Sequence, residues 1–107
     1  METVALHTRL RPGAETEYES IHQVIPAELD ARLREVGVHE WRIWRSGQDL
    51  FHLVTCVDYQ AMRRALQDDP VNVGWQERLA PLLKVADDYS GSDHGLDQVW
   101  SLPPERP

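Results

Sequence analysis

The segment from residue 38 to residue 57 constrains the fold most, because it reads as two strands joined by a short turn. Its two halves, VHEWRIWR (38–45) and LFHLVTCV (50–57), are rich in the aromatic and β-branched side chains that favour strands. The SGQD sequence between them, at 46–49, is typical of a hairpin turn. With Arg45 opposite Leu50, the predicted pairs on one face of the hairpin are Ile43 with His52, Trp41 with Val54, and His39 with Cys56.

The segment before the hairpin predicts one strand and one long helix. Residues 3–10 alternate apolar and polar side chains, as a strand does. A helix is expected over 14–35, bent near Pro26 and ended by Gly37. Its inward face is expected to carry Tyr18, Ile21, His22, Ile25, Leu29 and Leu33, which recur at spacings of three and four.

The segment after the hairpin predicts two short helices and a last strand. Asp58 is placed to cap a helix over 59–67, and Pro70 to begin another. The inner face of the latter is expected to carry Trp75, Leu79, Leu82 and Leu83. A loop over 87–95 and a strand with the sequence LDQVWSL, at 96–102, complete the prediction.

The predicted order of elements is β-α-β-β-α-β with the second helix split in two, which is the ferredoxin-like arrangement of the α+β class. Residues 1–102 are expected to form this single domain, and the Pro-rich tail at 103–107 to be flexible. A four-stranded sheet with helices on one face leaves its other face bare. Depending on register, Val4 and Leu6 or Phe51 and Leu53 would make that face apolar, which predicts a homodimer.

Composition narrows the classes of function. The chain has 107 residues and a formal net charge of −7, with no basic patch beyond ARLRE, which disfavours nucleic-acid binding. No apolar run approaches the roughly 18 to 20 residues that a membrane span needs, and the N-terminus lacks the features of a secretory signal. One cysteine, Cys56, cannot form an internal disulfide and suits the cytoplasm. We therefore expect a cytoplasmic protein that handles a small molecule.

The clearest candidate for chemistry is the pair Tyr18 and His22. Residues four apart are neighbours on one helix face, and histidine, with an ordinary pKa of about 6.5, is the usual general acid or base near neutral pH. Pro26 has no N–H to bond the His22 carbonyl, so this carbonyl would need another partner. Spacing alone also fits a structural histidine at the edge of the core.

The four tryptophans are a second signal. Trp75 stands at the start of a predicted helix with Asn72 and Gln76, where an indole and two amides could frame a polar ligand. Trp44 and Trp100 are expected to fill the core. His39, His52 and Cys56 could share a sheet face as metal ligands, with His7 on the first strand. No CxxC, HxH or HExxH spacing supports such a site, so neither metal nor cofactor is predicted.

Four motifs carry a resemblance that covers Val4 to Leu102: EYESIHQVIPAEL, GVHEWRIW, PVNVGWQ and LDQVWSLP. The chain resembles the L-rhamnose mutarotase family, small homodimeric ferredoxin-like enzymes that form a dimeric α/β barrel and interconvert the anomers of a 6-deoxyhexose without a cofactor. The resemblance implies that His22 is the catalytic proton donor. It also implies a sugar-binding pocket made by Tyr18, Trp41, Trp75 and Gln76.

Two departures from the family pattern leave the sugar open. The best-known members have tyrosine in place of Trp41 and a second tryptophan in place of Gln76. L-fucose mutarotases are similar to this family, and L-fucose differs from L-rhamnose in the orientation of its 2- and 4-hydroxyls. Two further alternatives stay open: a dimeric ferredoxin-like enzyme of the monooxygenase or haem-degrading type, and a sugar-binding module without catalysis.

Overall fold

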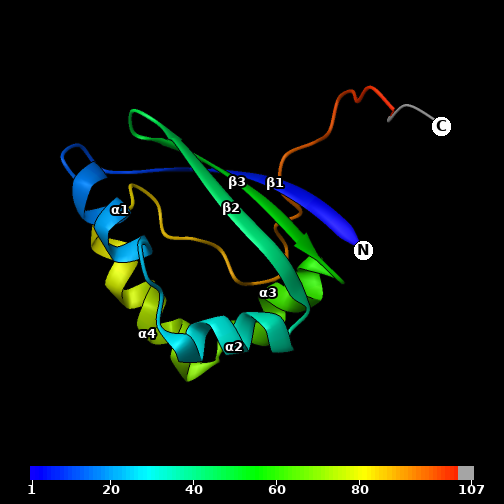
Figure 1. The fold of residues 1–107 in the computed structure, drawn as a ribbon, viewed down its shortest axis with the longest axis horizontal. Helices are drawn as coiled ribbons and strands as arrows, with labels where there is room; N and C mark the ends of the chain where they lie inside the picture. Colours follow the sequence, from blue (N-terminus) through cyan, green and yellow to red (C-terminus); the bar gives the residue numbers. More distant parts are fainter. Residues whose placement is uncertain (104–107) are drawn as a thin grey trace.

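The computed structural model describes residues 1–103 and shows a small α+β fold with the expected order of elements up to the last strand (Figure 1). The strands are β1 (Glu2–Arg9), β2 (Val38–Ser46) and β3 (Asp49–Cys56). The helices are α1 (Glu15–His22), α2 (Ala27–Glu35), α3 (Tyr59–Gln67) and α4 (Pro70–Leu79), and a 3-10 turn, Ala80–Leu82, follows α4. The tail prediction concerns mainly 104–107, which lie outside the described residues.

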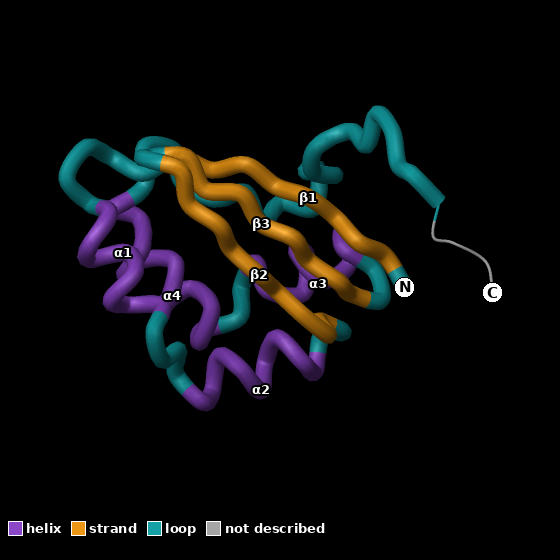
Figure 2. The backbone as a smooth tube through the Cα atoms, turned by 45° about the horizontal axis from the view of Figure 1, so that its top comes forward, coloured by secondary structure: helices purple, strands orange, loops and turns teal. Residues whose placement is uncertain are grey.

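The sheet is antiparallel with strand order β1-β3-β2, and all four helices lie on one of its faces (Figure 2). The predicted hairpin register is confirmed for Arg45 with Leu50, Ile43 with His52, and Trp41 with Val54. The two strands extend further into the turn than expected, so only Gly47 and Gln48 remain in it. Gly47 has φ +60°, a conformation that glycine adopts most easily.

One predicted pair is wrong, because the start of β2 contains a register shift between Val38 and Glu40. Val38, not His39, pairs with Cys56, and His39 is exposed. The Gly37 carbonyl accepts a hydrogen bond from Val57 N–H at 2.9 Å, so the residue before β2 is already bonded to the residue after β3. The extra residue is accommodated as a bulge.

The long first helix is also interrupted more than predicted. It does not bend at Pro26 but ends at His22, and α2 starts anew after Pro26, whose φ of −56° and ψ of 138° are those of a residue entering a helix. Proline cannot donate to the His22 carbonyl and disfavours helical backbone in the residue before it. The chain therefore leaves the helix over residues 23–25.

The second half of the chain begins its helices as predicted. The Asp58 carboxylate accepts from the backbone N–H of Ala61 at 3.1 Å, and Asp69 accepts from Val71 N–H at 2.9 Å. Pro70 is the first residue of α4. The predicted inward residues are all buried, namely Trp75, Leu79, Leu82 and Leu83.

The predicted last strand is not formed. Leu96 N–H donates to the Ala5 carbonyl on the edge of β1 at 2.8 Å, but residues 96–102 have no strand structure and lead away from the domain (Figure 1). Gly95 allows this one contact, because its φ is +79° and a Cβ there would lie 2.7 Å from the Ala5 carbonyl oxygen. Beyond it Val99 is 95% and Trp100 75% exposed, so these apolar side chains gain little burial that would hold the segment on the sheet.

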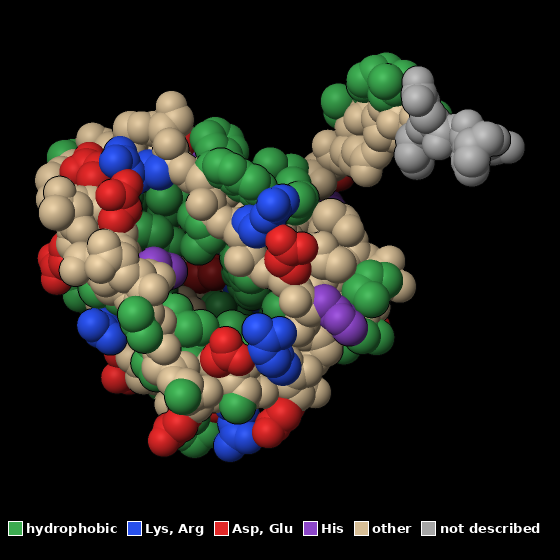
Figure 3. Space-filling model, in the orientation of Figure 1, with side chains coloured by type: hydrophobic (Ala, Val, Ile, Leu, Met, Phe, Trp, Pro, Cys, Tyr) green, Lys and Arg blue, Asp and Glu red, His purple; other side chains and the backbone are tan. Residues whose placement is uncertain are grey.

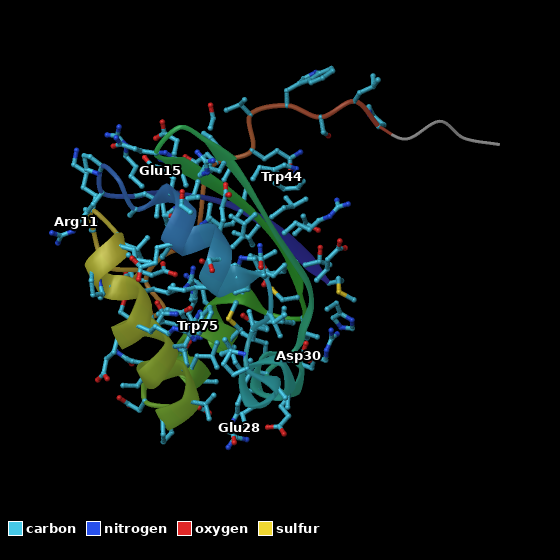
Figure 4. All side chains as sticks on the ribbon, turned by 60° about the vertical axis from the view of Figure 1, so that its left-hand side comes forward. Arg11, Glu15, Glu28, Asp30, Trp44 and Trp75 are labelled. Atoms are coloured by element: carbon cyan, nitrogen blue, oxygen red, sulfur yellow. The ribbon has the colours of Figure 1, made fainter. Side chains whose placement is uncertain are left out.

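The outer face of the sheet carries apolar side chains, and the strand register shows that they include Phe51 and not Leu6. Leu6 points toward the helices and is buried, whereas Phe51 lies on the outer face and is 43% exposed. Trp44 was expected in the core but is 52% exposed on the outer side of β2, as Figure 4 shows. Trp100 was expected there too and is 75% exposed. Among the described residues, no helix has the length and apolar character that a membrane crossing requires.

Candidate active site

A cavity of about 350 Å³ opens between the inner face of the sheet and helices α1, α2 and α4. This volume is typical of a small-molecule site, roughly 300 to 1,000 Å³. In Figure 3 the hollow has apolar and acidic atoms at its floor and a histidine at its rim. Its polar and aromatic lining consists of Thr8, Tyr18, His22, Trp41, His52, Asn72, Trp75, Gln76, Asp87 and Tyr89. Its apolar lining consists of Ile25, Leu29, Leu33, Ile43, Leu79 and Leu83.

His22 is held in a single orientation by the helix that carries it. Its Nδ1 lies 2.9 Å from the Tyr18 carbonyl oxygen, and because a carbonyl only accepts, Nδ1 carries the proton. The ring stacks on that of Tyr18 with centroids 4.1 Å apart and meets the edge of Trp75 at 5.2 Å. In the neutral ring Nε2 is therefore an acceptor with a free lone pair.

Burial sets the protonation of this pair. Burial lowers the pKa of His22 below its ordinary 6.5, the hydrogen bond to the Tyr18 carbonyl opposes this, and the nearby charge of Arg78 lowers it further. Burial and the charge of Asp87 raise the pKa of the Tyr18 phenol well above its usual value. At neutral pH the site thus holds a neutral imidazole beside a phenol that keeps its proton.

Helix α4 contributes an aromatic wall and an amide. Trp75 lies on the side of α4 that faces the centre of the molecule (Figure 4) and is 9% exposed. The Gln76 amide nitrogen donates to the hydroxyl of Tyr89 at 3.0 Å and to the amide oxygen of Asn72 at 3.3 Å. These bonds use the amide nitrogen, so among residues 1–103 the amide oxygen of Gln76, a residue of the cavity lining, is left as an acceptor.

Trp41 faces the cavity from β2, but its N–H is already used. Nε1 donates to Nδ1 of His52, on the adjacent strand β3, at 3.1 Å. The other ring nitrogen of His52, Nε2, lies 2.9 Å from the hydroxyl oxygen of Thr8 on β1. Trp41 therefore offers a ligand only its ring face. A polar contact with a ligand on this side of the cavity would have to come from Thr8 on β1 or His52 on β3.

A buried arginine attaches the segment after η1 (Ala80–Leu82) to the cavity. Arg63 of α3 is fully buried and contacts Asp87 through Nη1 at 3.0 Å and the Tyr59 hydroxyl through Nε at 2.8 Å. Its guanidinium carbon lies 4.4 Å from the ring centroid of Tyr89 and 5.6 Å from that of Trp41. Asp87 and Tyr89 are thereby held as one wall of the cavity.

The structure brings all five residues named from the sequence, His22, Tyr18, Trp41, Trp75 and Gln76, to this one cavity. Sequence reasoning missed Thr8 and assigned His52 no role in binding, and it left open whether Asp87, Asp88 or Tyr89 would close over the pocket; of these, Asp87 and Tyr89 line the cavity. Alternation along the strands places Thr8 and His52 on the inner face, so that signal was available. Nothing in the sequence of the 87–95 loop indicated where it would lie.

The cavity does not have the donor set of a metal site. Across residues 1–103, no three His, Cys, Asp or Glu side chains gather closely enough to hold a metal ion. His39, considered as a ligand, is exposed at the bulge, whereas Cys56 is buried in the core.

Comparisons with known proteins agree on one family. Residues 3–102 match the family model described as L-rhamnose mutarotase. The L-rhamnose mutarotase of Paraburkholderia xenovorans is 31% identical over 104 residues, covering 95% of this chain and 96% of that protein. That of Brucella anthropi is 32% identical over 104 residues, covering 95% and 97%.

A solved structure shows the same fold. The crystal structure of an L-rhamnose mutarotase from Formosa agariphila superposes with a TM-score of 0.78, covering 96% of this chain and all of that one. At 22% sequence identity this similarity concerns the fold alone.

Proposed function

The chain belongs to the L-rhamnose mutarotase family, and on that premise we propose that it is an isomerase that interconverts the α and β anomers of L-rhamnose. The observation that carries the proposal is the orientation of His22: its Nδ1 proton is bound by the Tyr18 carbonyl at 2.9 Å, which leaves Nε2 free to exchange a proton with a ligand. The partner is a monosaccharide, and the chemistry uses no cofactor.

Mutarotation requires that the anomeric hydroxyl lose a proton and the ring oxygen gain one. In the neutral resting ring, Nε2 of His22 accepts the proton of the anomeric O1–H. As the C1–O1 carbonyl forms, the C1–O5 bond breaks with its electron pair moving to O5, and the imidazolium of His22 returns the proton to O5. Rotation about C1–C2 and the reverse steps on the other carbonyl face give the other anomer.

His22 is thus the proton donor at the ring oxygen, but only after it has first acted as a base. O1 and O5 are bonded to the same carbon, so one imidazole can serve both. Tyr18 orients the sugar and does not relay the second proton, because the raised pKa of its phenol disfavours loss of the phenol proton. The ring faces of Trp41 and Trp75 pack on the sugar, and the amide oxygen of Gln76 accepts from a hydroxyl.

The test is NMR saturation transfer between the anomeric protons of L-rhamnose, and separately of L-fucose. Wild type should accelerate exchange in L-rhamnose. His22→Ala should lower the enzyme-dependent exchange about 100-fold or more, since general acid–base catalysis contributes typically 10²- to 10⁴-fold. His39→Ala, the same change at an exposed histidine on β2, is the matched control and should exchange like wild type.

Each contrary result has a definite meaning. Exchange confined to L-fucose would reassign the substrate and retain the chemistry. Binding of both sugars without exchange would indicate a sugar-binding module. Full activity in His22→Ala would refute the assignment of His22.

We also propose that the chain forms the ferredoxin-like homodimer, a dimeric α/β barrel, by joining the bare sheet faces of two copies. The support is the apolar surface of that face, with Trp44 and Phe51 half-exposed, and the exposed segment Leu96 to Leu102. In the dimer this segment would form the fourth strand, which the single chain does not hold on β1. The cytoplasmic location expected from the single cysteine remains a prediction.

Light scattering coupled to size-exclusion chromatography tests the dimer. Wild type should elute with twice the chain mass, and Trp44→Lys with the mass of one chain, because a charge would be buried at the interface. Val24→Lys, at an 84% exposed site between α1 and α2, is the control and should remain a dimer. A wild-type monomer would refute the proposal.

A further inference from the structure

The three strands carry a chain of hydrogen bonds whose direction is determined at one end. An indole N–H can only donate, so the 3.1 Å contact makes Nδ1 of His52 an acceptor of the Trp41 proton. A neutral imidazole with an accepting Nδ1 carries its proton on Nε2. The 2.9 Å contact is therefore a bond that His52 donates to the hydroxyl oxygen of Thr8.

This direction leaves the hydroxyl proton of Thr8 unused. A hydroxyl has one proton and two lone pairs, and His52 occupies one lone pair. Among residues 1–103, the His52 bond is the only hydrogen bond of the Thr8 side chain. Since Thr8, His52 and Trp41 all line the cavity, the free O–H has a ligand site within reach.

Burial keeps the direction constant. His52 is 7% exposed, and desolvation lowers its pKa to about 4, with Asp87 opposing and Arg63, His22 and His7 adding to the effect. A protonated ring would present an N–H to the N–H of Trp41 and break the chain. Above about pH 5 the neutral tautomer, and with it the donor character of Thr8, therefore persists.

We propose that Thr8 is a sugar-binding residue that donates its hydroxyl proton to an oxygen of the bound sugar, and that Trp41 and His52 are positioning residues that fix Thr8 as this donor. The inference rests on the proposed function and deepens it. It adds a directed polar contact at the wall formed by the sheet, opposite His22 and Trp75. Such a contact selects for a sugar oxygen at that position, because a sugar without it would leave a desolvated hydroxyl unpaired.

The experiment measures KM and kcat by saturation transfer for L-rhamnose and for its 2-, 3- and 4-deoxy analogues. Thr8→Val should raise the KM for L-rhamnose about 3- to 10-fold, the loss of one neutral hydrogen bond, with little change in kcat. Thr8→Ser retains the hydroxyl and should restore the wild-type KM. Thr3→Val, the same change at an exposed position of β1, is the control and should not alter it.

The analogues identify the acceptor. If Thr8 donates to one of the three hydroxyls, the analogue that lacks this hydroxyl cannot accept the bond. Wild type and Thr8→Val should then have the same KM for that analogue. If the effect of Thr8→Val persists in all three analogues, the acceptor is O1 or O5, which also supports the proposal. An unchanged KM for L-rhamnose in a folded Thr8→Val variant would overturn it.

Two variants of His52 test the positioning role. His52→Phe removes the bond that directs Thr8, so the KM of this variant should lie between those of wild type and Thr8→Val. Thr8→Val should also raise the KM by a smaller factor in the His52→Phe background than in wild type. His52→Gln offers one acceptor and one donor and should restore the wild-type KM. A wild-type KM in His52→Phe would refute the positioning role alone. Absence of exchange with wild type in any of the sugars would refute the proposed function, and the inference with it.

Discussion

Acid should destabilise this protein through one identified group, His52. Its pKa is about 4 in the folded chain and near the ordinary 6.5 in the unfolded chain, so the unfolded state binds more protons between these pH values. The contribution of His52 to stability is therefore complete above about pH 6.5 and decreases as the pH falls toward 4. The physical cause is that protonation charges a buried ring and sets two N–H groups, of His52 and Trp41, against each other.

The size of the effect follows from the two pKa values. At about 1.36 kcal/mol per pH unit, His52 should contribute roughly 2 kcal/mol of lost stability between pH 7 and 5, and about 3 kcal/mol by pH 4. Small domains are stable by only about 5 to 15 kcal/mol, so one side chain would account for a measurable part of acid unfolding.

The assay is urea unfolding of wild type and His52→Gln at pH 7, 6, 5 and 4.5. Gln cannot titrate but can keep both hydrogen bonds, so the difference between the two curves isolates the histidine. The free energy of unfolding of wild type should fall by about 2 kcal/mol more than that of His52→Gln between pH 7 and 5. His39→Gln controls for removal of an exposed histidine. Parallel curves for wild type and His52→Gln would refute the assigned tautomer and burial.

The site and its supports give three further predictions. Because His22 must be neutral to start the reaction and its pKa is lowered, kcat/KM should fall only when the pH drops below 6.5; a midpoint at or above 6.5 would contradict this. Asp87→Asn leaves the buried Arg63 guanidinium without its counter-charge and should cost about 3 kcal/mol or more in urea unfolding, whereas Asp88→Asn, at the exposed neighbour, should cost far less. Asp69→Ala removes the cap of α4 and should lower the free energy of unfolding by about 1 kcal/mol, with a cost near zero counting against the capping role.

Local patterns predicted the elements whose stability depends on near neighbours in the chain. Alternation and the short turn placed His52 and Trp41 on one sheet face, and the spacing of four placed Tyr18 beside His22. The cap at Asp58 was equally predictable, because a capping side chain bonds backbone within three residues of itself, and so was the start of α4 at Pro70. In each case the interaction partners are close in sequence or aligned by a two-residue period.

Contacts between segments far apart in the sequence could not be predicted from such local patterns. Arg63 appears in the sequence as one of two adjacent arginines on a helix, yet it is fully buried and holds Asp87 and Tyr89 against the cavity. The LDQVWSL segment has the alternation of apolar and polar side chains that a strand needs, but it does not form a strand. Within the described chain it makes only one backbone hydrogen bond to β1. A strand needs a partner and a surface to cover, and alternation specifies neither.

The α+β class, the hairpin register from Trp41 to Arg45 and the contact of His22 with Tyr18 were predictable from the residues alone, since they depend on backbone periodicity and short-range bonds. The folded chain was needed to see that the first helix breaks completely before Pro26, and that Thr8, His52 and Trp41 form one directed chain of hydrogen bonds. It alone showed that a buried arginine closes the cavity with the loop after α4. These features depend on which side chains are removed from water together, and that is determined only when the whole chain packs.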